Sequence, residues 1–517
     1  MLFFILVSAL LSFCAAVLTR RLAFKVQAID AVQGGRKIHT KPTPMLGGLG
    51  IGLTILFVAV GTIFMHPGMF EETFLVRIGG FLAGIILLLI GGSLDDRYNL
   101  KPWMQICFPI AAALCVMLTG TSILEISSLA GKGVWSLDWW HASTTFFGHA
   151  LRFVFPADLL TLAWLLGVTY ATKTMDGIDG LVTGQTVIGI LLIILLALSP
   201  RFYQPEIVVI AAIILGAFAG FLPWNISPAR QFLGESGSTL AGFSLGFLAI
   251  VSGAKVATAF MALGIPLVDF LRVILRRIHA GRSPFQGDDT HLHFQLLHLQ
   301  FTPRQVAAFF WMLTLIFGLA ALGLQTRGKT VLIIGLIAVT LMLALGAARL
   351  RSSISITWRK RVLILTALIT LAVGAWSIWG LWREYVRSSD VQEIQLQNKK
   401  LFLEIADTPQ EREQGLSDRA SMRTDHGMLF VFPRPDRYTF WMPRMQFDLD
   451  IIWLNGSRIV DVVRLPAPTL VQEIPARHTP AEPADRVLEL VAGQAAVHGF
   501  LKGAIVPQLE IGTAKDK

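Results

Sequence analysis

Long apolar runs recur along most of this chain and constrain its fold more than any other feature. A helix that crosses a bilayer needs about 20 mostly apolar residues, and its backbone must be satisfied internally because the hydrocarbon core holds no water. Runs of about that length lie near 1–18, 46–65, 76–93, 104–120, 157–172, 181–199, 205–223, 237–253, 256–273, 305–323, 330–348 and 362–382. We therefore expect a polytopic α-helical membrane protein with about 11–12 transmembrane helices.

The composition changes after the last of these runs. Before Arg383 the chain has 27 basic and 15 acidic residues, a net charge of +12, whereas residues 383–517 have 17 and 19, a net charge of −2. The tail has the charge content of a soluble domain. The whole chain has only 15% charged and 54% hydrophobic residues, which excludes an ordinary soluble protein. The sequence predicts a membrane domain over 1–350, an additional transmembrane helix and linker over 351–391, and a small, mainly β soluble domain over 392–517.

Lysine and arginine in the loops predict the orientation. When the loops are assigned alternately to two sides, 20 basic residues of the body fall on one side and 7 on the other. The positive-inside rule makes the richer side cytoplasmic. We therefore expect a protein of the inner (plasma) membrane, with the tail extracytoplasmic if 362–382 spans and cytoplasmic if it does not. Because this charge lies in short loops between apolar runs, it predicts contact with lipid or phosphate and no nucleic-acid partner.

The acidic residues of the body concentrate on the same side. Nine of its 15 acids lie in or beside the cytoplasmic loops: Asp30, Asp95, Asp96, Asp176, Asp179, Glu235, Asp269, Asp288 and Asp289. Charges beside a bilayer are costly and usually functional. A single acid there often only caps a helix, but acids at several helix ends on one side indicate a shared site.

Three short motifs carry these acids. The run G-G-S-L-D-D-R contains Asp95 and Asp96, adjacent carboxylates that repel unless a cation or a phosphate–metal complex shares their field. The run T-K-T-M-D-G-I-D-G-L contains Asp176 and Asp179, with glycines that permit tight turns beside a ligand. The run G-E-S-G-S places Glu235 at a helix N-terminus, where backbone N–H groups attract phosphate.

Two further loops supply cations. The loop R-R-I-H-A-G-R-S-P-F-Q-G-D-D-T-H-L-H-F contains an H-x-H pair, but it has no cysteine and no obvious third ligand for a zinc site, so phosphate contact fits better. The first loop, R-K-I-H-T-K, is also basic. Carboxylates, cations and glycines gathered on one face are what Mg²⁺-assisted phosphoryl transfer requires, and Mn²⁺ is an alternative ion.

These motifs, in this order over about residues 20–345, resemble the polyprenyl-phosphate N-acetylhexosamine-1-phosphate transferases of the glycosyltransferase family 4 type. The resemblance implies a helical bundle with a cytoplasmic active site. It also implies transfer of a HexNAc 1-phosphate from a UDP-sugar to an undecaprenyl-type polyprenyl phosphate, with Mg²⁺ and with release of UMP. That reaction is the first membrane step of cell-envelope polysaccharide synthesis. A homodimer is left open.

The resemblance extends to single residues. It implies that Asp95 and Asp96 bind metal and activate the lipid phosphate, and that Asp176 assists catalysis. The substrate-binding residues, predicted from the motifs and the loop cations together, are Lys37, His39, Lys173, Asp179, Asn225, Arg276, Arg282, His291 and His293. The predicted metal ligands are Glu235, Asp95 and Asp96.

The chain departs from the family pattern in three places. Glu235 replaces the aspartate of G-D-x-G-S, and the longer side chain moves the oxygens by about 1 Å, a misplacement that can cost about 100-fold in rate. Tyr170 and Lys173 replace the two asparagines of N-A-x-N, so amide contacts are lost and a cation for phosphate is gained. Phe294 replaces the last histidine of H-L-H-H.

Two other classes of function compete with this interpretation. A secondary transporter would carry ionisable residues at mid-span and inverted repeats, whereas here only Asp269 is expected within a span. A catalytically degenerate body would only anchor the tail as a binding module.

The tail resembles a small β-rich family of unknown function, DUF192, over about 392–512. Alternating apolar residues predict strands over 401–405 and 449–454. The side chains Trp441, Met442, Phe447 and Trp453 either line a groove or form the core of a small β domain. Asp448 and Asp450 are expected on an exposed strand face, and no chemistry is assigned to the tail.

Overall fold

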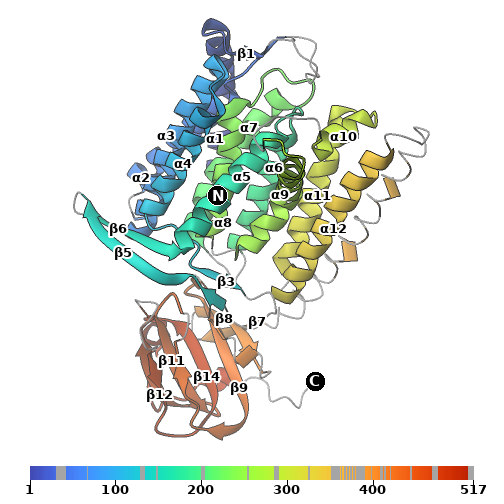
Figure 1. The fold of residues 1–517 in the computed structure, drawn as a ribbon. Helices are drawn as coiled ribbons and strands as arrows, with labels where there is room; N and C mark the ends of the chain where they lie inside the picture. Colours follow the sequence, from blue (N-terminus) through green and yellow to red (C-terminus); the bar gives the residue numbers. More distant parts are fainter. Residues whose placement is uncertain are drawn as a thin grey trace. The chain divides into compact units, whose positions relative to one another are not determined.

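A computed structural model gives the fold of the chain (Figure 1). It describes residues 1–30, 42–66, 68–127, 134–146, 149–198, 204–252, 255–283, 290–323 and 326–350. In the tail it describes residues 391–510, apart from 397–398, 408–410, 413–414, 418, 420, 443–444 and 469–475; between 351 and 390 it describes only scattered positions. Two compact units result: Met1–Ala197 with Pro205–Leu381, and Trp382–Lys517 with Leu198–Gln204.

The first eleven apolar runs each coincide with a helix. These helices are α1 (Leu2–Lys25), α2 (Gly47–Met65), α3 (Glu72–Tyr98), α4 (Pro102–Leu118), α5 (Ala157–Met175), α6 (Leu181–Ala197), α7 (Pro205–Asn225), α8 (Gly234–Val251), α9 (Lys255–His279), α11 (Pro303–Gly323) and α12 (Thr326–Leu350). A short helix, α10 (Leu292–His298), precedes α11. The twelfth run, 362–382, falls largely outside the described residues.

Six helices of the described part are long and apolar enough to cross a membrane: α1, α2, α3, α7, α11 and α12. Helices α4 and α6 are also apolar but shorter. The chain is therefore a multi-pass membrane protein, as predicted. The expectation of about 11–12 spans exceeds these six because several of the other helices are too short or carry too much charge or polarity to qualify by composition alone.

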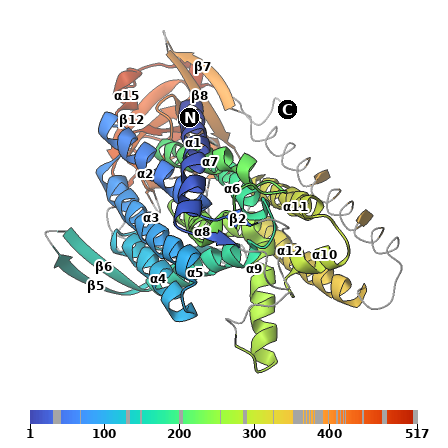
Figure 2. The same cartoon turned by 90° about the horizontal axis from the view of Figure 1, so that it is seen from above.

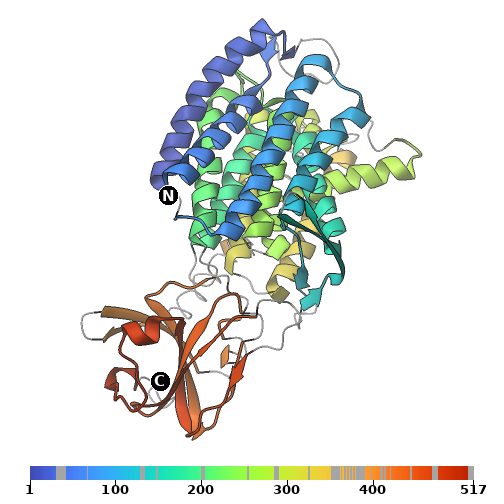
Figure 3. The ribbon, with the colours of Figure 1, turned by 90° about the vertical axis from the view of Figure 1, so that its left-hand side faces the viewer.

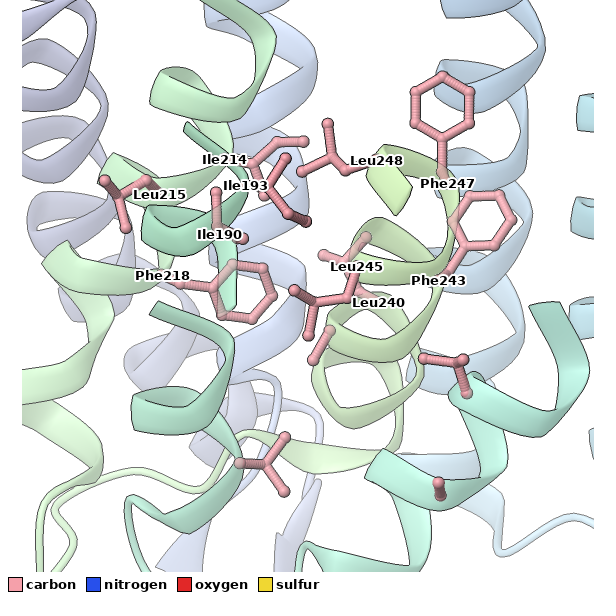
Figure 4. Close-up of a cluster of buried hydrophobic side chains, with 14 of the residues drawn as sticks. Ile190, Ile193, Ile214, Leu215, Phe218, Leu240, Phe243, Leu245, Phe247 and Leu248 are labelled. Carbon is pink, nitrogen blue, oxygen red and sulfur yellow. The ribbon is translucent and has the colours of Figure 1, made fainter. Parts of the chain in front are cut away.

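Helix α8 lies in the middle of the helical unit and is buried along most of its length. Its Leu240, Leu245 and Leu248 side chains face apolar side chains of α6 and α7 (Figure 4). On another side, Phe81 of α3 stacks on Phe243 and Phe247, with ring centroids 5.5 and 4.2 Å apart. Apolar packing on several sides therefore fixes the position of α8, including its first turn.

Glycines allow the backbones of α2 and α3 to contact the backbone of the first turn of α8 directly. A Cβ added to Gly48 of α2 would lie 2.0 Å from the backbone nitrogen of Gly237, and one added to Gly92 of α3 would lie 2.2 Å from Cα of Ser236. No side chain fits at such distances. The two glycines thus set how closely α2 and α3 pack on the N-terminus of α8.

The connections gather at two ends of the helical unit. A short ladder of β1 (Ile29–Asp30) and β2 (Thr43–Pro44) lies with α10 at one end, and the hairpin of β5 (Asp138–Phe146) and β6 (His149–Pro156) lies at the other (Figure 1). Strands β3 (Glu125–Ser127) and β4 (Val134–Ser136) pair before the hairpin. The C-terminal part of α9 projects from the bundle (Figures 2 and 3).

The second unit is built on a six-stranded sheet in the order β12-β11-β14-β9-β8-β7. Its strands are β7 (Val391–Leu396), β8 (Lys399–Ala406), β9 (His426–Asp436), β11 (Leu449–Asn455), β12 (Arg458–Leu465) and β14 (Ala484–Val491). Strands β8 and β9 run parallel and the other neighbours antiparallel. Strands β10 (Phe440–Trp441) and β13 (Arg477–His478) form a separate pair, and the unit also contains α15 (Gln494–Val497) and the turn η2 (Pro507–Leu509). The small β domain and its two predicted strands are confirmed.

Both faces of this sheet are covered by apolar cores. Trp453 and Met442 are fully buried, which supports the core interpretation over a groove, whereas Trp441 is 60% exposed. The expectation of an exposed Asp450 was wrong. Its carboxylate is buried because one oxygen accepts hydrogen bonds from the backbone nitrogens of Gly493 and Ala495, and the other from an arginine.

One buried acid in this unit has an altered pKa. Glu489 on β14 is 5% exposed, and its Oε2 has no hydrogen-bond partner in the described part of the tail. Burial raises the pKa of this carboxyl to about 8, against a smaller opposing effect of Arg419. The folded domain therefore binds a proton that the unfolded chain releases near its ordinary pKa of about 4.3.

The first prediction concerns Gly92. Replacement by Ala inserts a methyl group against the Ser236 backbone, and overpacking of this kind typically costs about 1–3 kcal/mol. We expect a lower thermal midpoint of the purified protein in detergent. Gly79→Ala, on the same helix with no atom within 4 Å of the added Cβ, is the control and should not lower the midpoint. Equal midpoints for the two variants would contradict the close-packing interpretation.

The second prediction concerns Glu489. Because its folded pKa is raised, its contribution to stability is complete below about pH 4.3 and is lost as the pH rises through about 8. The loss approaches about 1.4 kcal/mol per pH unit within that window. Hydrogen exchange of the β14 amides in the full-length protein measures the opening free energy. Glu489→Gln should flatten its pH dependence, and an unchanged slope would refute the assignment.

Candidate functional site

The two predicted aspartates at the end of α3 have different environments. Asp95 Oδ1 accepts hydrogen bonds from the backbone nitrogen of Leu100 (2.7 Å) and from Gln105 Nε2 (3.0 Å). Asp96 is buried, and its Oδ1 accepts from the backbone nitrogen of Glu235 (2.8 Å). Asp96 thus joins α3 to the N-terminus of α8, where the free N–H groups of the helix stabilise its negative charge.

Gly234 makes this contact possible. It has a positive φ of 74°, and a Cβ at this position would lie 2.6 Å from Asp96 Oδ2. Only glycine adopts this backbone conformation without strain while leaving room for the carboxylate. The Asp96 carboxylate is therefore held directly against the turn that begins α8.

Two of the departures from the family pattern are in contact with each other. The Lys173 ammonium, near the end of α5, forms a salt bridge with Glu235 Oε1. It also donates a hydrogen bond to Gln105 Oε1 at 2.9 Å. The same ammonium lies 5.3 Å from the ring centroid of Tyr170, within the range of a cation–π interaction.

Asp176 follows α5 directly. Burial, followed by the charges of Glu235, Asp96 and Asp179, raises the pKa of Asp176 well above its usual range. The structure therefore brings the acids of the three motifs into one electrostatically coupled cluster. Repulsion on this scale is relieved when a cation or a proton enters the cluster.

Asp179 and Asn225 hold the loop that follows α5. Asp179 Oδ2 accepts from the backbone nitrogen of Ala229 at 2.9 Å. Asn225 Oδ1 accepts from the backbone nitrogen of Gly180 (3.2 Å) and the hydroxyl of Thr183 (2.6 Å), and its Nδ2 donates to a backbone oxygen. Asn225 is buried, so in this structure its amide positions the D-G-I-D-G loop.

Helix α10 brings the H-x-H pair to the same loop. Asp269 Oδ2 lies 2.9 Å from His291 Nδ1 and accepts from the backbone nitrogen of Leu292, while Arg272 binds Oδ1 of the same carboxylate. This contact with Nδ1 fixes the orientation of the His291 imidazole ring.

His293 is fully buried, and neither ring nitrogen has a hydrogen-bond partner among the residues that the structure describes. Burial lowers its pKa to about 3, so the ring is neutral. A Cβ on Gly177 of the D-G-I-D-G loop would lie 3.0 Å from His293 Nε2 and 2.6 Å from the Phe294 ring. The Phe294 ring therefore fills the space beside Gly177.

The remaining predicted cations are not placed in this cluster. Arg276 and Arg282 are exposed, at the projecting end of α9 and in the turn after it (Figures 2 and 3). Lys37 and His39 lie outside the described residues. Their substrate-binding roles stay predictions.

A small pocket opens beside the acids. It is lined by Gly91, Gly92, Asp95, Gln105, Phe108, Pro109, Glu235 and Thr239, and it is a shallow hollow, open to solvent, with room for about one water molecule. The lining combines four polar side chains with glycine, proline and phenylalanine. Such a lining suits an anionic head group attached to an apolar chain.

The donor chemistry of the cluster fits Mg²⁺, since carboxylate oxygens are its preferred protein ligands. Among the described residues, however, no group of three or more histidine, cysteine, aspartate or glutamate side chains is arranged to hold a metal ion. The contacts explain this: Glu235 is bound to Lys173 and Asp96 to backbone donors. An ion that binds Glu235 Oε1 would have to replace Lys173.

Sequence reasoning missed Gln105, which links Asp95 to Lys173. Its only signal is a polar residue near the start of an apolar run. It counted Asp269 among the acids of one face but did not predict that Asp269 and Arg272 orient His291. An acid three residues before an arginine was the available signal.

Comparison of the sequence with known proteins shows the family of the chain. Residues 78–253 match the model of glycosyl transferase family 4. The decaprenyl-phosphate N-acetylglucosaminephosphotransferase of Mycobacterium tuberculosis (strain CDC 1551 / Oshkosh) is 30% identical over 348 residues, which cover 61% of this chain and 81% of the relative. The chain belongs to this family. The "Probable undecaprenyl-phosphate N-acetylglucosaminyl 1-phosphate transferase" of Bacillus subtilis (strain 168) is 28% identical over 327 residues, 62% of this chain and 84% of the relative.

Family membership agrees with the transferase prediction and not with the transporter or anchor alternatives. The tail matches the uncharacterised family DUF192 over residues 392–507, so the predicted fusion is confirmed. A solved structure of a protein of unknown function from Novosphingobium aromaticivorans is 32% identical and covers 21% of this chain and 75% of its own, with a TM-score of 0.19.

The third prediction tests the positioning role of Asn225. Asn225→Ala leaves the Gly180 N–H and the Thr183 hydroxyl without their acceptor, at a cost of about 1–3 kcal/mol for each unsatisfied group. We expect a clearly lower thermal midpoint of the purified protein. An unchanged midpoint combined with weaker UDP-sugar binding would instead make Asn225 a substrate contact.

Proposed function

We propose that this protein transfers an N-acetylhexosamine 1-phosphate from a UDP-sugar to a polyprenyl phosphate, with release of UMP. The observation that carries the proposal is the cluster of Asp95, Asp96, Asp176 and Glu235 beside a pocket that is half polar and half apolar. This cluster lies in a chain whose relatives are named as N-acetylglucosaminyl 1-phosphate transferases acting on undecaprenyl or decaprenyl phosphate.

The proposed reaction is a direct displacement. An oxygen of the lipid phosphate attacks the β-phosphorus of the UDP-sugar, a new P–O bond forms, and the bond between the β-phosphorus and the bridging oxygen breaks, so that UMP leaves with that oxygen. Asp95 lines the pocket and is the better candidate to accept a proton from the lipid phosphate. Asp96, whose oxygens face backbone and hydroxyl donors of α8, positions the turn that carries Glu235.

We propose Mg²⁺ as the cofactor, with Mn²⁺ as an alternative, held by Glu235 together with Asp95 or Asp96. When bound, the ion neutralises charge on the diphosphate. His291, oriented by Asp269, presents a ring nitrogen on the same side, and Arg276 and Arg282 are proposed to attract the anionic substrate.

The charge distribution supports a cytoplasmic active site in the inner membrane, because the loops that carry the motifs are the basic ones. A nucleotide sugar made in the cytoplasm then reaches the cluster without crossing the bilayer. The tail is extracytoplasmic if the run 362–382 spans. Assembly as a homodimer stays a prediction.

The fourth prediction is release of UMP by the purified full-length protein from UDP-N-acetylglucosamine, undecaprenyl phosphate and Mg²⁺. Asp176→Asn should lower the rate by about 100-fold or more, because electrostatic contributions of single groups in such sites are of that size. Glu206→Gln keeps the acceptor for the Glu71 backbone nitrogen, lies at the opposite end of α7 from Asn225, and should retain activity. No UMP release from a panel of UDP-sugars would refute the proposal.

A further inference from the structure

The Lys173 ammonium is a positive charge built into the acid cluster. It lies near the end of α5 with 19% of its side chain exposed, and it contacts Glu235 and Gln105. Both partners line the pocket beside Asp95. The ammonium therefore occupies the edge of the space in which a phosphate and a divalent ion would meet.

The two residues of this pair depend on each other. Glu235 is 17% exposed, and an anion held there needs a counter-charge because burial removes most of its hydration. The long lysine stem reaches from α5 to α8, and the Tyr170 ring stabilises the ammonium at the other side. The two side chains are thus long enough to meet between α5 and α8, and their charges are opposite.

This pairing limits which carboxylate oxygens can bind a divalent ion at the site. A carboxylate oxygen that binds an ammonium at hydrogen-bond distance is not free to ligate a metal. For Glu235 Oε1 to bind an ion, Lys173 must move away, and an ammonium that moves away needs another anion. Three N–H donors on a flexible stem suit a phosphate oxygen, and a diphosphate would bring one to the neighbouring pocket.

We infer that Lys173 is an exchangeable counter-ion of Glu235. It neutralises this carboxylate before substrate binds, and it transfers to a substrate phosphate when a divalent ion takes its place. Metal binding at Glu235 is then coupled to binding of the nucleotide diphosphate. The inference rests on the proposed function for the identity of the anion, but the pairing itself is a property of this chain.

The experiment measures Mn²⁺ binding to the purified full-length protein by electron paramagnetic resonance of the free ion, with and without UDP. In the wild-type protein we expect weak Mn²⁺ binding that UDP strengthens by roughly 5–150-fold, the usual range for coupled ligands, with a reciprocal effect of Mn²⁺ on UDP. Lys173→Gln should bind Mn²⁺ at least about tenfold more tightly than the wild type without UDP.

The matched control is Lys101→Gln. Lys101 is an exposed lysine at the start of α4, and its replacement removes the same charge without touching Glu235. It should leave Mn²⁺ affinity within about twofold of the wild type, a difference of less than about 0.5 kcal/mol. Lys173→Arg, which keeps the cation, should also stay close to the wild type. Equal affinities of the Lys173→Gln and Lys101→Gln variants would overturn the inference.

Turnover provides a second test, in which Lys173→Gln should have the opposite effect from its effect on Mn²⁺ binding. If Lys173 transfers to the substrate, Lys173→Gln binds the metal more tightly and yet has a lower kcat/KM for the UDP-sugar. Tighter Mn²⁺ binding with undiminished kcat/KM would overturn the transfer step. The Mn²⁺ measurement needs no reaction, so a wild-type protein that binds Mn²⁺ as expected but releases no UMP would refute the proposed function and not the pairing.

Discussion

The close approach of three helices around the first turn of α8 is the constraint on which the rest of the site depends. Gly48 and Gly92 bring the backbones of α2 and α3 against Ser236 and Gly237. Asp96 then reaches the N-terminus of α8, and Glu235 faces the end of α5. Without this backbone contact the acids would belong to separate helix ends, and their charges would not interact.

The cluster shows how a membrane protein tolerates several buried acids at one place. Asp96 is stabilised by backbone and hydroxyl donors, Glu235 by the ammonium of Lys173, and Asp95 by a backbone nitrogen and Gln105. Asp95 and Asp96 are thus held by neutral donors, and Glu235 by a cation. Burial, with a smaller effect of the neighbouring acids, raises the pKa of Asp176, which has no such compensating contact to a cation among the described residues.

Much of the fold follows from the sequence, because hydrophobic length and alternation are local signals. The eleven helices and the strands β8 and β11 coincide with the apolar runs and alternating segments. The hairpin β5–β6 was not predicted, since neither of its strands forms a long apolar run or alternates regularly between apolar and polar residues. Asp450 was wrongly expected at the surface because alternation alone does not show that the backbone nitrogens of a distant turn converge on its carboxylate.

By itself the sequence determined the membrane class, the separate β domain and the acids of the candidate site, because these depend on composition, period and short motifs. Only the tertiary structure decided how those acids are used. It paired Lys173 with Glu235, added Gln105, gave Asn225 a positioning role and attached His291 to Asp269. In these contacts the two bonded residues are 22 to 68 residues apart in the chain. Such contacts depend on helix packing, which no local pattern specifies.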